Sequence, residues 1–241
     1  MLENKLRAGI FISETWDGHS QEGLTRLLGN FIYNYNLDIL LGPEWLFLPK
    51  NRFYSEKEKC DIVQCLAEIT EGRKTLLIPG SIMWHDEKHY YNTVPVITDG
   101  KLLGEYNKQS NCGSSDKALE RVATDNLTYR AGRGFGLYHW SEYKIGVEIC
   151  ADQGLLADHM RCREDPLLDF YFLVSCGKKL IKECMPIKTG GYGLNSDGSG
   201  WISEVMQRKP TEGLKDDFCK LKPSNTDELH LDIYELQINK P

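Results

Sequence analysis

The chain has 241 residues, of which 41% are hydrophobic, and this length predicts one domain spanning residues 1–241 around a single core. The formal net charge of −6 comes from scattered acidic residues and no basic stripe is visible, so nucleic acid is not an expected partner. No apolar run is long enough to span a membrane and the amino terminus lacks a secretion signal, so we expect a cytoplasmic protein without a membrane partner.

The amino-terminal half of the sequence predicts strands and helices in alternation. Apolar residues recur at helical spacing across 22–35, and Ser55 is placed to cap a second helix that Gly72 ends. Asp99-Gly100 between two alternating segments is a strong turn signal for a hairpin. The predicted strands of this half cover residues 7–13, 37–45, 75–83, 90–98 and 101–108.

The carboxyl-terminal half continues with shorter elements. Residues 109–130 are interpreted as a polar loop or short helix, and the glycine-rich residues 189–200 as a flexible loop with too little apolar content to pack. Together the elements predict an α/β fold, an α-β-β-α sandwich of two mixed β-sheets with helices on the outer faces. The predicted strands of this half cover 135–140, 143–150, 170–175, 201–208 and 228–237, and a short helix covers 155–160.

A cysteine at the end of a strand is the most informative feature of the chain. Residues 143–149 alternate in the period-2 pattern of a strand, and Cys150 follows directly. Catalytic groups of α/β proteins gather where strands end and loops begin, so this thiol is placed like a nucleophile. A buried core cysteine is the alternative, because a free cysteine behaves as a small hydrophobe.

Two further strand ends carry charged side chains. The apolar strand 37–45 stops at Gly42-Pro43 and presents Glu44, and the strand 101–108 ends in Lys108. Taken singly, each of these residues is more consistent with a solvated surface charge than with a catalytic role. Together with Cys150, however, they place Glu, Lys and Cys at three strand ends in that chain order.

The order Glu, Lys, Cys resembles the triad of the nitrilase superfamily, the carbon–nitrogen hydrolases. Motifs of that family match the chain in the correct order across roughly residues 5–180, although each motif is modest by itself. The resemblance implies the same α-β-β-α sandwich. The matching segments are Pro43-Glu44, Tyr91-Asn92-Thr93, Asp99-Gly100 with Gly104, Tyr106 and Lys108, Ala131-Gly132, Lys144 to Asp152, and Asp169 to Cys176.

The resemblance implies a role for each catalytic residue. Glu44 would take the proton of the Cys150 thiol, because a thiol is mostly protonated at neutral pH and burial strengthens a carboxylate as a base. Lys108 and the backbone N–H of Ala151 would stabilise the oxyanion, and a thioester acyl-enzyme would follow. The expected reaction is hydrolysis of a small non-peptide C–N bond, with a small-molecule amide-type substrate and no metal or organic cofactor.

Two other acidic positions are candidates for support of the substrate or the oxyanion. Many family members carry a second glutamate between the lysine and the cysteine, and Glu120 is the best match here, with Asp116 behind it. Strand alternation would place Glu148 on the same face as Cys150, about 6–7 Å away. Glu148 either shapes the substrate pocket or satisfies a buried hydrogen bond, and the sequence leaves both open.

Alternatives to an amidase stay open. Ala151-Asp152 after the nucleophile is closer to the amidase branches than the Trp-Glu of nitrilases, so nitrile hydrolysis ranks lower, and acyl transfer is not distinguished from hydrolysis. The altered loops also allow a catalytically degenerate member that binds a small molecule or partner protein. A papain-like protease ranks lower still, because neither His159 nor His230 has the surrounding pattern of such an enzyme.

The spacing of the cysteines disfavours a metal site. The eight cysteines include no Cys-x-x-Cys pair to begin a structural zinc site. Members of the family usually dimerise through helices near the nucleophile. The resemblance therefore implies a homodimer, with an interface at residues 153–162.

Overall fold

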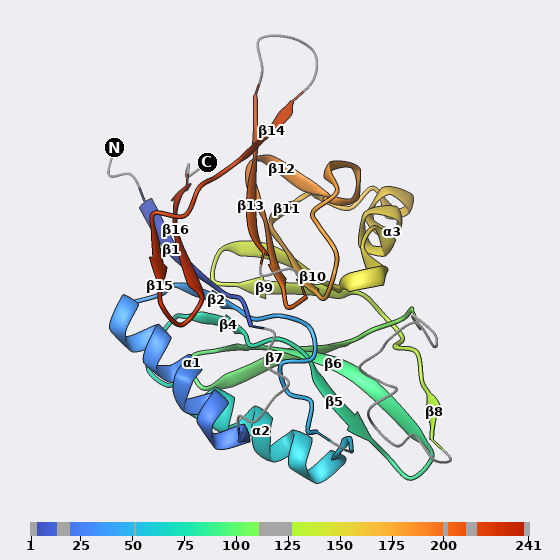
Figure 1. The fold of residues 1–241 in the computed structure, drawn as a ribbon. Helices are drawn as coiled ribbons and strands as arrows, with labels where there is room; N and C mark the ends of the chain where they lie inside the picture. The colour runs from blue at the N-terminus through green and yellow to red at the C-terminus, as the bar shows by residue number, and fades with distance from the viewer. Residues whose placement is uncertain are drawn as a thin grey trace.

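The described strands form two stacked β-sheets (Figure 1). The structure, a computed structural model, describes residues 4–13, 20–50, 52–110, 127–199, 202–210 and 216–238. Within these ranges ten strands belong to one sheet, sheet A, and six to the other, sheet B. Each sheet contains parallel and antiparallel pairs, so the predicted α/β class with two mixed sheets is confirmed.

Sheet A is built from both ends of the chain. Its strands are β1 (Asn4–Phe11), β2 (Ile39–Leu41), β3 (Tyr54–Ser55), β4 (Leu76–Ile78), β5 (Ile82–His85), β6 (His89–Thr98), β7 (Lys101–Asn107), β8 (Thr128–Tyr129), β15 (Asn225–Asp227) and β16 (Leu231–Ile238). Their order is β15-β16-β1-β2-β4-β6-β5-β3, and β7 and β8 also pair with β6. Strand β1 runs antiparallel to β16 and parallel to β2, so the first and last strands of the chain lie side by side.

Sheet B contains the strand that precedes the candidate nucleophile. Its strands are β9 (Gly136–Trp140), β10 (Tyr143–Ile149), β11 (Leu168–Ser175), β12 (Ile187–Asp197), β13 (Ile202–Lys209) and β14 (Asp217–Lys220). They follow the order β14-β13-β12-β11-β10-β9. Strands β10, β11 and β12 are mutually parallel, so their carboxyl ends lie at the same edge of the sheet.

Helices cover the outer face of each sheet (Figure 1). Helices α1 (Gln21–Tyr35) and α2 (Glu56–Glu68) lie on sheet A, and α3 (Leu155–Arg163) lies on sheet B. The side chain of Ser20 accepts a hydrogen bond from the Gly23 N–H and begins α1. Ser55 and Glu58 form a reciprocal capping box that begins α2, at the position the sequence predicts.

Three apolar clusters separate these layers. Between the sheets, Ile10 and Val94 of sheet A belong to one cluster with Val147 and Phe172 of sheet B. Strands β2, β4 and β11 are buried on both faces, so their sequences are almost continuously apolar and do not alternate with polar residues. The order helix, sheet, sheet, helix confirms the predicted sandwich. The outer clusters include Leu28, Ile62 and Leu77 under α1 and α2, and Leu156, Met160 and Tyr171 under α3.

The glycine-rich segment 189–200 is not the flexible loop that the sequence predicts. Its residues up to Asp197 belong to β12, which pairs with β11 and β13 in the interior of sheet B. Gly193 packs closely against the neighbouring chain, since a Cβ there would lie 2.3 Å from the Met185 sulfur. Tyr192 and Leu194 fill the core between the sheets, which is enough apolar surface for a strand.

Other predicted elements differ in their bounds. The predicted strand 75–83 is two strands, β4 and β5, because Pro79-Gly80 turns the chain and Gly80 has a φ of 98°. Strands β3, β8, β14 and β15 were not predicted. Most of the predicted polar segment 109–130 lies outside the described residues. Among the described helices, none is long and apolar enough to cross a membrane.

Candidate active site

Glu44 lies in a tight turn after β2. The Gly42 N–H donates to the Ile78 carbonyl at 2.8 Å, and a Cβ on Gly42 would lie only 2.4 Å from the Pro79 carbonyl oxygen. This close approach of two backbones requires glycine. The Glu44 N–H donates to the carbonyl of Ser175 at the end of β11, at 3.2 Å. The turn therefore ties Glu44 to both sheets.

Lys108 follows β7, and its backbone is held on both sides. Its N–H donates to the Asn92 carbonyl at 2.9 Å, and its carbonyl accepts from the Gly132 N–H at 3.0 Å. A Cβ on Gly132 would lie 2.0 Å from the Asn107 carbonyl oxygen, so this contact also requires glycine. Two of the motifs that support the family resemblance thus meet at the lysine.

Cys150 occupies a sharp turn at the end of β10. Its φ of 46° lies in the left-handed region, which is uncommon for a residue other than glycine. It begins a single 3₁₀ turn, Cys150–Asp152. The thiol, 7% exposed, donates to the Cys176 carbonyl with a sulfur–oxygen distance of 3.7 Å. Backbone outliers of this kind are frequent at active sites, and they also occur here in ordinary turns such as those at Asn36 and Asp99.

The three predicted catalytic side chains meet between the sheets. Lys108 Nζ donates to Glu44 Oε1 at 2.7 Å, and both side chains are buried. Asn92 Nδ2 donates to the same oxygen at 2.9 Å. The charge of Glu44 acts on the Cys150 thiol, so the two groups lie close together. One carboxylate oxygen is therefore shared by a cation and an amide, and the carboxylate lies beside the candidate nucleophile.

Burial raises the pKa of the Cys150 thiol far above its ordinary value. The charge of Glu44 raises the pKa further, whereas the Lys108 ammonium lowers it. The resting thiol is therefore protonated at neutral pH. Any attack by the sulfur requires a base that takes this proton as the new bond forms, and Glu44 is in place for that step.

The structure corrects the predicted position of Glu148. Its carboxylate points toward α3 and accepts from the N–H groups of Gly154 and Leu156 and from the Tyr171 hydroxyl, at 3.0, 2.7 and 2.6 Å. It does not share a face with Cys150, whose side chain belongs to the core between the sheets. Strand alternation fails there because the backbone turns at Cys150. Of the two open interpretations, the contacts support the buried hydrogen-bonding role.

Of the other two supporting candidates, Ala151 and Glu120, only Ala151 lies among the described residues. Ala151 is the exposed middle residue of the 3₁₀ turn, directly after the nucleophile. Glu120 and Asp116 lie outside the described residues, so a second catalytic glutamate stays a prediction. Asn92 is a site residue to which the sequence assigned no role. Its place in the Tyr91-Asn92-Thr93 motif was the available signal.

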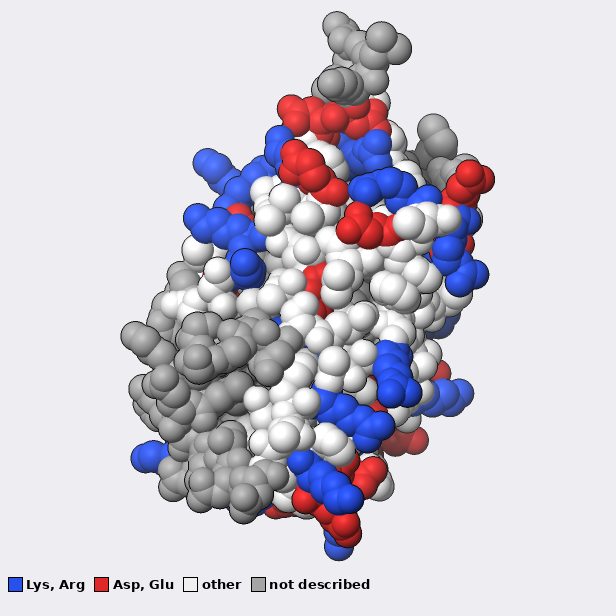
Figure 2. Space-filling view, turned by 90° about the vertical axis from the view of Figure 1, so that its right-hand side faces the viewer, with Lys and Arg blue, Asp and Glu red and all other residues white. Residues whose placement is uncertain are grey.

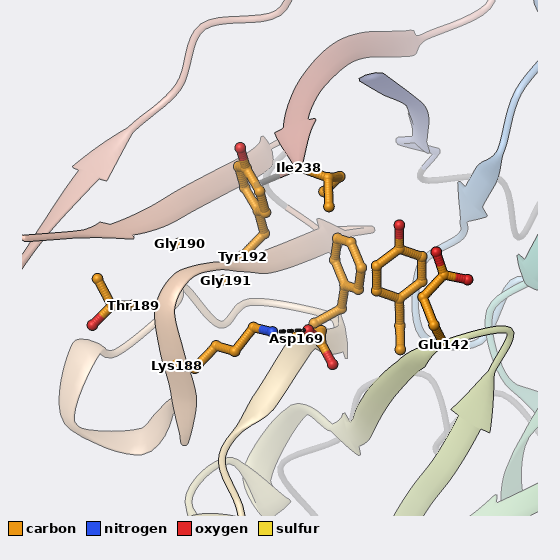
Figure 3. Close-up of a pocket in the computed structure, with 10 residues that line it drawn as sticks. Glu142, Asp169, Lys188, Thr189, Gly190, Gly191, Tyr192 and Ile238 are labelled. Atoms are coloured by element: carbon orange, nitrogen blue, oxygen red, sulfur yellow. Dashed lines mark ion pairs between the residues drawn. The ribbon is translucent and has the colours of Figure 1, made fainter. Parts of the chain in front are cut away.

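A separate pocket of about 120 Å³ opens at the end of sheet B opposite to Cys150 (Figure 3). The rings of Tyr143, Phe170 and Tyr192 line it, and the Lys188–Asp169 ion pair lies at its side. Tyr143 begins β10, whose carboxyl end leads to Cys150, so the strand separates this pocket from the thiol by about 23 Å. The pocket is therefore distinct from the candidate active site.

The described residues contain no group of three or more His, Cys, Asp or Glu side chains arranged to hold a metal ion. The chemistry available at the site from its described side chains is that of a thiol, a carboxylate, an ammonium and an amide. These groups suit nucleophilic attack with proton transfer.

No family model and no curated protein matches the sequence. Solved structures do match it. The protein is similar to Saccharomyces cerevisiae Nit3, a member of branch 10 of the nitrilase superfamily, with 16% identity over 97% of this chain and 90% of that chain and a TM-score of 0.62.

Two further solved structures are similar over comparable lengths. An amidase from Nesterenkonia sp. has 13% identity over 96% of this chain and 90% of that chain, with a TM-score of 0.64. The CN-hydrolase superfamily protein XC1258 from Xanthomonas campestris has 16% identity over 97% and 91%, with a TM-score of 0.62. The chain thus has the fold of the nitrilase superfamily, the fold that its motifs predict.

Proposed function

We propose that the protein is a carbon–nitrogen hydrolase of the nitrilase superfamily that cleaves a small, non-peptide, amide-type bond. The observation that carries the proposal is the buried ion pair of Lys108 and Glu44 beside the strand-end thiol of Cys150. A buried ion pair is costly to maintain and is weak evidence for stability alone. Its position beside a nucleophile gives it a chemical use.

The first half of the reaction forms a thioester. As the Cys150 sulfur attacks the amide carbon, its proton passes to Glu44, and the Lys108 ammonium and the Ala151 N–H stabilise the negative charge that develops on the carbonyl oxygen. The C–N bond then breaks. Glu44 returns the proton to the leaving nitrogen, so the amine departs neutral and the acyl group stays on sulfur.

The second half regenerates the thiol. Glu44 takes a proton from water, the resulting hydroxide equivalent attacks the thioester carbon, and the C–S bond breaks. The acid leaves, and the proton held by Glu44 returns to the sulfur. No external oxidant or reductant enters. A matching fold in an amidase supports an amide-type substrate, with nitrile hydrolysis and acyl transfer as the lower-ranked alternatives.

A panel of small amides, carbamoyl compounds and nitriles, with ammonia and acid release measured together, tests the proposal. We expect turnover of at least one amide and loss of turnover in Cys150→Ser, because a hydroxyl is much harder to deprotonate than a thiol. Glu44→Gln should also change the rate at which iodoacetamide modifies Cys150. It should not change the rates for the exposed Cys60 and Cys219. Release from nitriles alone would overturn the choice of substrate class.

Single-turnover acylation, measured by mass spectrometry, tests the separate catalytic roles of Glu44 and Lys108. Glu44→Gln keeps the shape and removes the base, so acyl-enzyme should not accumulate. Lys108→Met should lose about 3–4 kcal/mol of transition-state stabilisation, a rate loss of about 10²–10³-fold. Binding of amides without turnover by the wild-type protein would instead support a degenerate member of the superfamily.

A further inference from the structure

One buried carboxylate joins the segment that carries Lys108 to the turn that carries Cys150. Asp152 is fully buried, at 0% exposure, two residues after the nucleophile. Its Oδ2 accepts from the Tyr106 hydroxyl and from the Gln109 N–H, each at 2.7 Å. Its Oδ1 accepts from the Ser110 N–H at 2.7 Å. Both oxygens are therefore occupied by donors from one short segment.

These three donors surround Lys108 in the sequence. Tyr106 lies two residues before the lysine, and Gln109 and Ser110 follow it directly. Lys108 follows a strand of sheet A, whereas Asp152 belongs to the turn at the end of β10 in sheet B. The three hydrogen bonds thus cross from one sheet to the other, close to where the catalytic side chains meet.

We propose that Asp152 is a positioning residue that sets the place of the Lys108 ammonium relative to the Cys150 thiol. The inference rests on the proposed function of the triad and adds a residue to it. It also gives a physical reason for two spacings in the sequence. A tyrosine two residues before the lysine and an aspartate two residues after the cysteine face each other only if both strand ends are aligned.

The chemistry of the three donors requires a carboxylate. Two backbone N–H groups can only donate, and burial together with the charge of Asp152 raises the pKa of Tyr106, which keeps its hydroxyl protonated. An asparagine at position 152 would offer one acceptor oxygen and would turn its NH₂ group toward a donor. Asp152→Asn should therefore release the segment that holds Lys108 while changing the side-chain volume very little.

If Asp152 served stability alone, Asp152→Asn would give a different result. The direction in which the alkylation rate of Cys150 changes distinguishes a positioning role from a purely stabilising one. Removing a negative charge near a thiol favours the thiolate by simple electrostatics, so Asp152→Asn would speed alkylation of Cys150 if Lys108 stayed in place. If Asp152 positions Lys108, the ammonium moves away and its lowering of the thiol pKa is lost. Alkylation then slows.

The experiment measures the rate of iodoacetamide modification of Cys150 at fixed pH by peptide mass spectrometry, with a melting curve for each variant. The variants are Asp152→Asn, Tyr106→Phe and, as a reference for loss of the ammonium, Lys108→Met. The matched control is Glu204→Gln. Glu204 is also a buried carboxylate that accepts a backbone N–H, from Leu180 at 2.9 Å, but it lies on β13 away from the triad.

We expect Lys108→Met to slow the alkylation about tenfold for each pKa unit by which the thiol rises. Asp152→Asn should slow it in the same direction by a smaller factor, Tyr106→Phe by less, and Glu204→Gln not at all. A folded Asp152→Asn protein with wild-type or faster alkylation would overturn the inference, while slow alkylation in Lys108→Met would leave the proposed function standing.

If Asp152→Asn does not fold, Tyr106→Phe decides the question, because it removes one donor and leaves both backbone hydrogen bonds. An unchanged rate in Tyr106→Phe would then overturn the positioning role. An unchanged rate in Lys108→Met would overturn this inference, because the ammonium would then have no effect on the thiol. The proposed function is tested separately, by turnover of the amide panel. A positioning role also predicts that kcat falls with little change in KM, once a substrate is known.

Discussion

Each polar side chain of the candidate site is held by a contact from a distant part of the chain. Glu44 accepts hydrogen bonds from Lys108 and Asn92. Asp152 accepts hydrogen bonds from the segment around the lysine. The sequence predicted Glu44, Lys108 and Cys150 as a group because strand ends can be identified from local patterns. It did not assign roles to Asn92 and Asp152, because their roles depend on side-chain contacts between strands.

Asn92→Ala is expected to lower the rate of acylation by about 10–100-fold, because a hydrogen bond to a charged group contributes about 1.5–3 kcal/mol. The amide donates to Glu44 Oε1, the oxygen that Lys108 also contacts, so its loss should leave the base less firmly oriented. Single-turnover kinetics with the best amide would measure the effect. Wild-type acylation in a folded Asn92→Ala protein would contradict the role of this hydrogen bond.

At the scale of the elements, turns rather than strands decide where the site residues point. Local propensity predicted the helices α1 and α2 well, because their caps and apolar spacing are local. It failed at segment 189–200, where β12 is stabilised by its neighbours β11 and β13 in the sheet. It also placed Glu148 on the wrong face, because the turn at Cys150 interrupts the alternation.

Gly42→Ala should destabilise the protein by about 1–3 kcal/mol, the usual range for overpacking, and should also reduce acylation. The new Cβ would meet the Pro79 carbonyl oxygen at 2.4 Å, and the turn that must shift carries Glu44. The matched control is Gly29→Ala in α1, where the nearest atom, on Ile69, is 3.4 Å away. Urea unfolding should show the control unchanged or slightly more stable. Equal stability of both variants would contradict this account of the turn.

Glu148 should make stability depend on pH. Burial raises the pKa of this carboxyl from 4.5 to about 7, so the folded state holds its proton more tightly than the unfolded state. The contribution of Glu148 to the free energy of unfolding is complete below the unfolded pKa and is lost as the pH rises through about 7. The free energy of unfolding should fall by about 3 kcal/mol over this range.

Urea unfolding of the wild-type protein and of Glu148→Gln at several pH values between 4.5 and 8 tests this prediction. Glutamine does not titrate, so the variant should lose less stability than the wild type as the pH rises. Because the carboxyl accepts from the first N–H groups of α3, the loss should accompany fraying of that helix. Parallel pH curves for the two proteins would show that Glu148 does not titrate in this range.

At the scale of the whole molecule, the face that carries α3 has four of the eight exposed large apolar side chains found among the described residues. This face is on the right in Figure 1 and toward the viewer in Figure 2, where the centre is mostly uncharged and the charged side chains lie mainly around it. Phe135 stacks on His159 of α3. The exposed apolar residues in or next to α3, along the chain or by contact, are Phe135, Leu155, Leu167 and Ile181.

We propose that this face forms a homodimer, with the segment 153–162, most of which is α3, at its centre. Burial of exposed apolar side chains is the main favourable term in such association. Analytical ultracentrifugation at micromolar concentration should show a dimer for the wild-type chain and a monomer for Leu155→Glu. The matched control is Leu229→Glu, which changes an exposed leucine in the turn before β16, away from α3. A wild-type monomer, or equal dissociation in both variants, would rule out this interface.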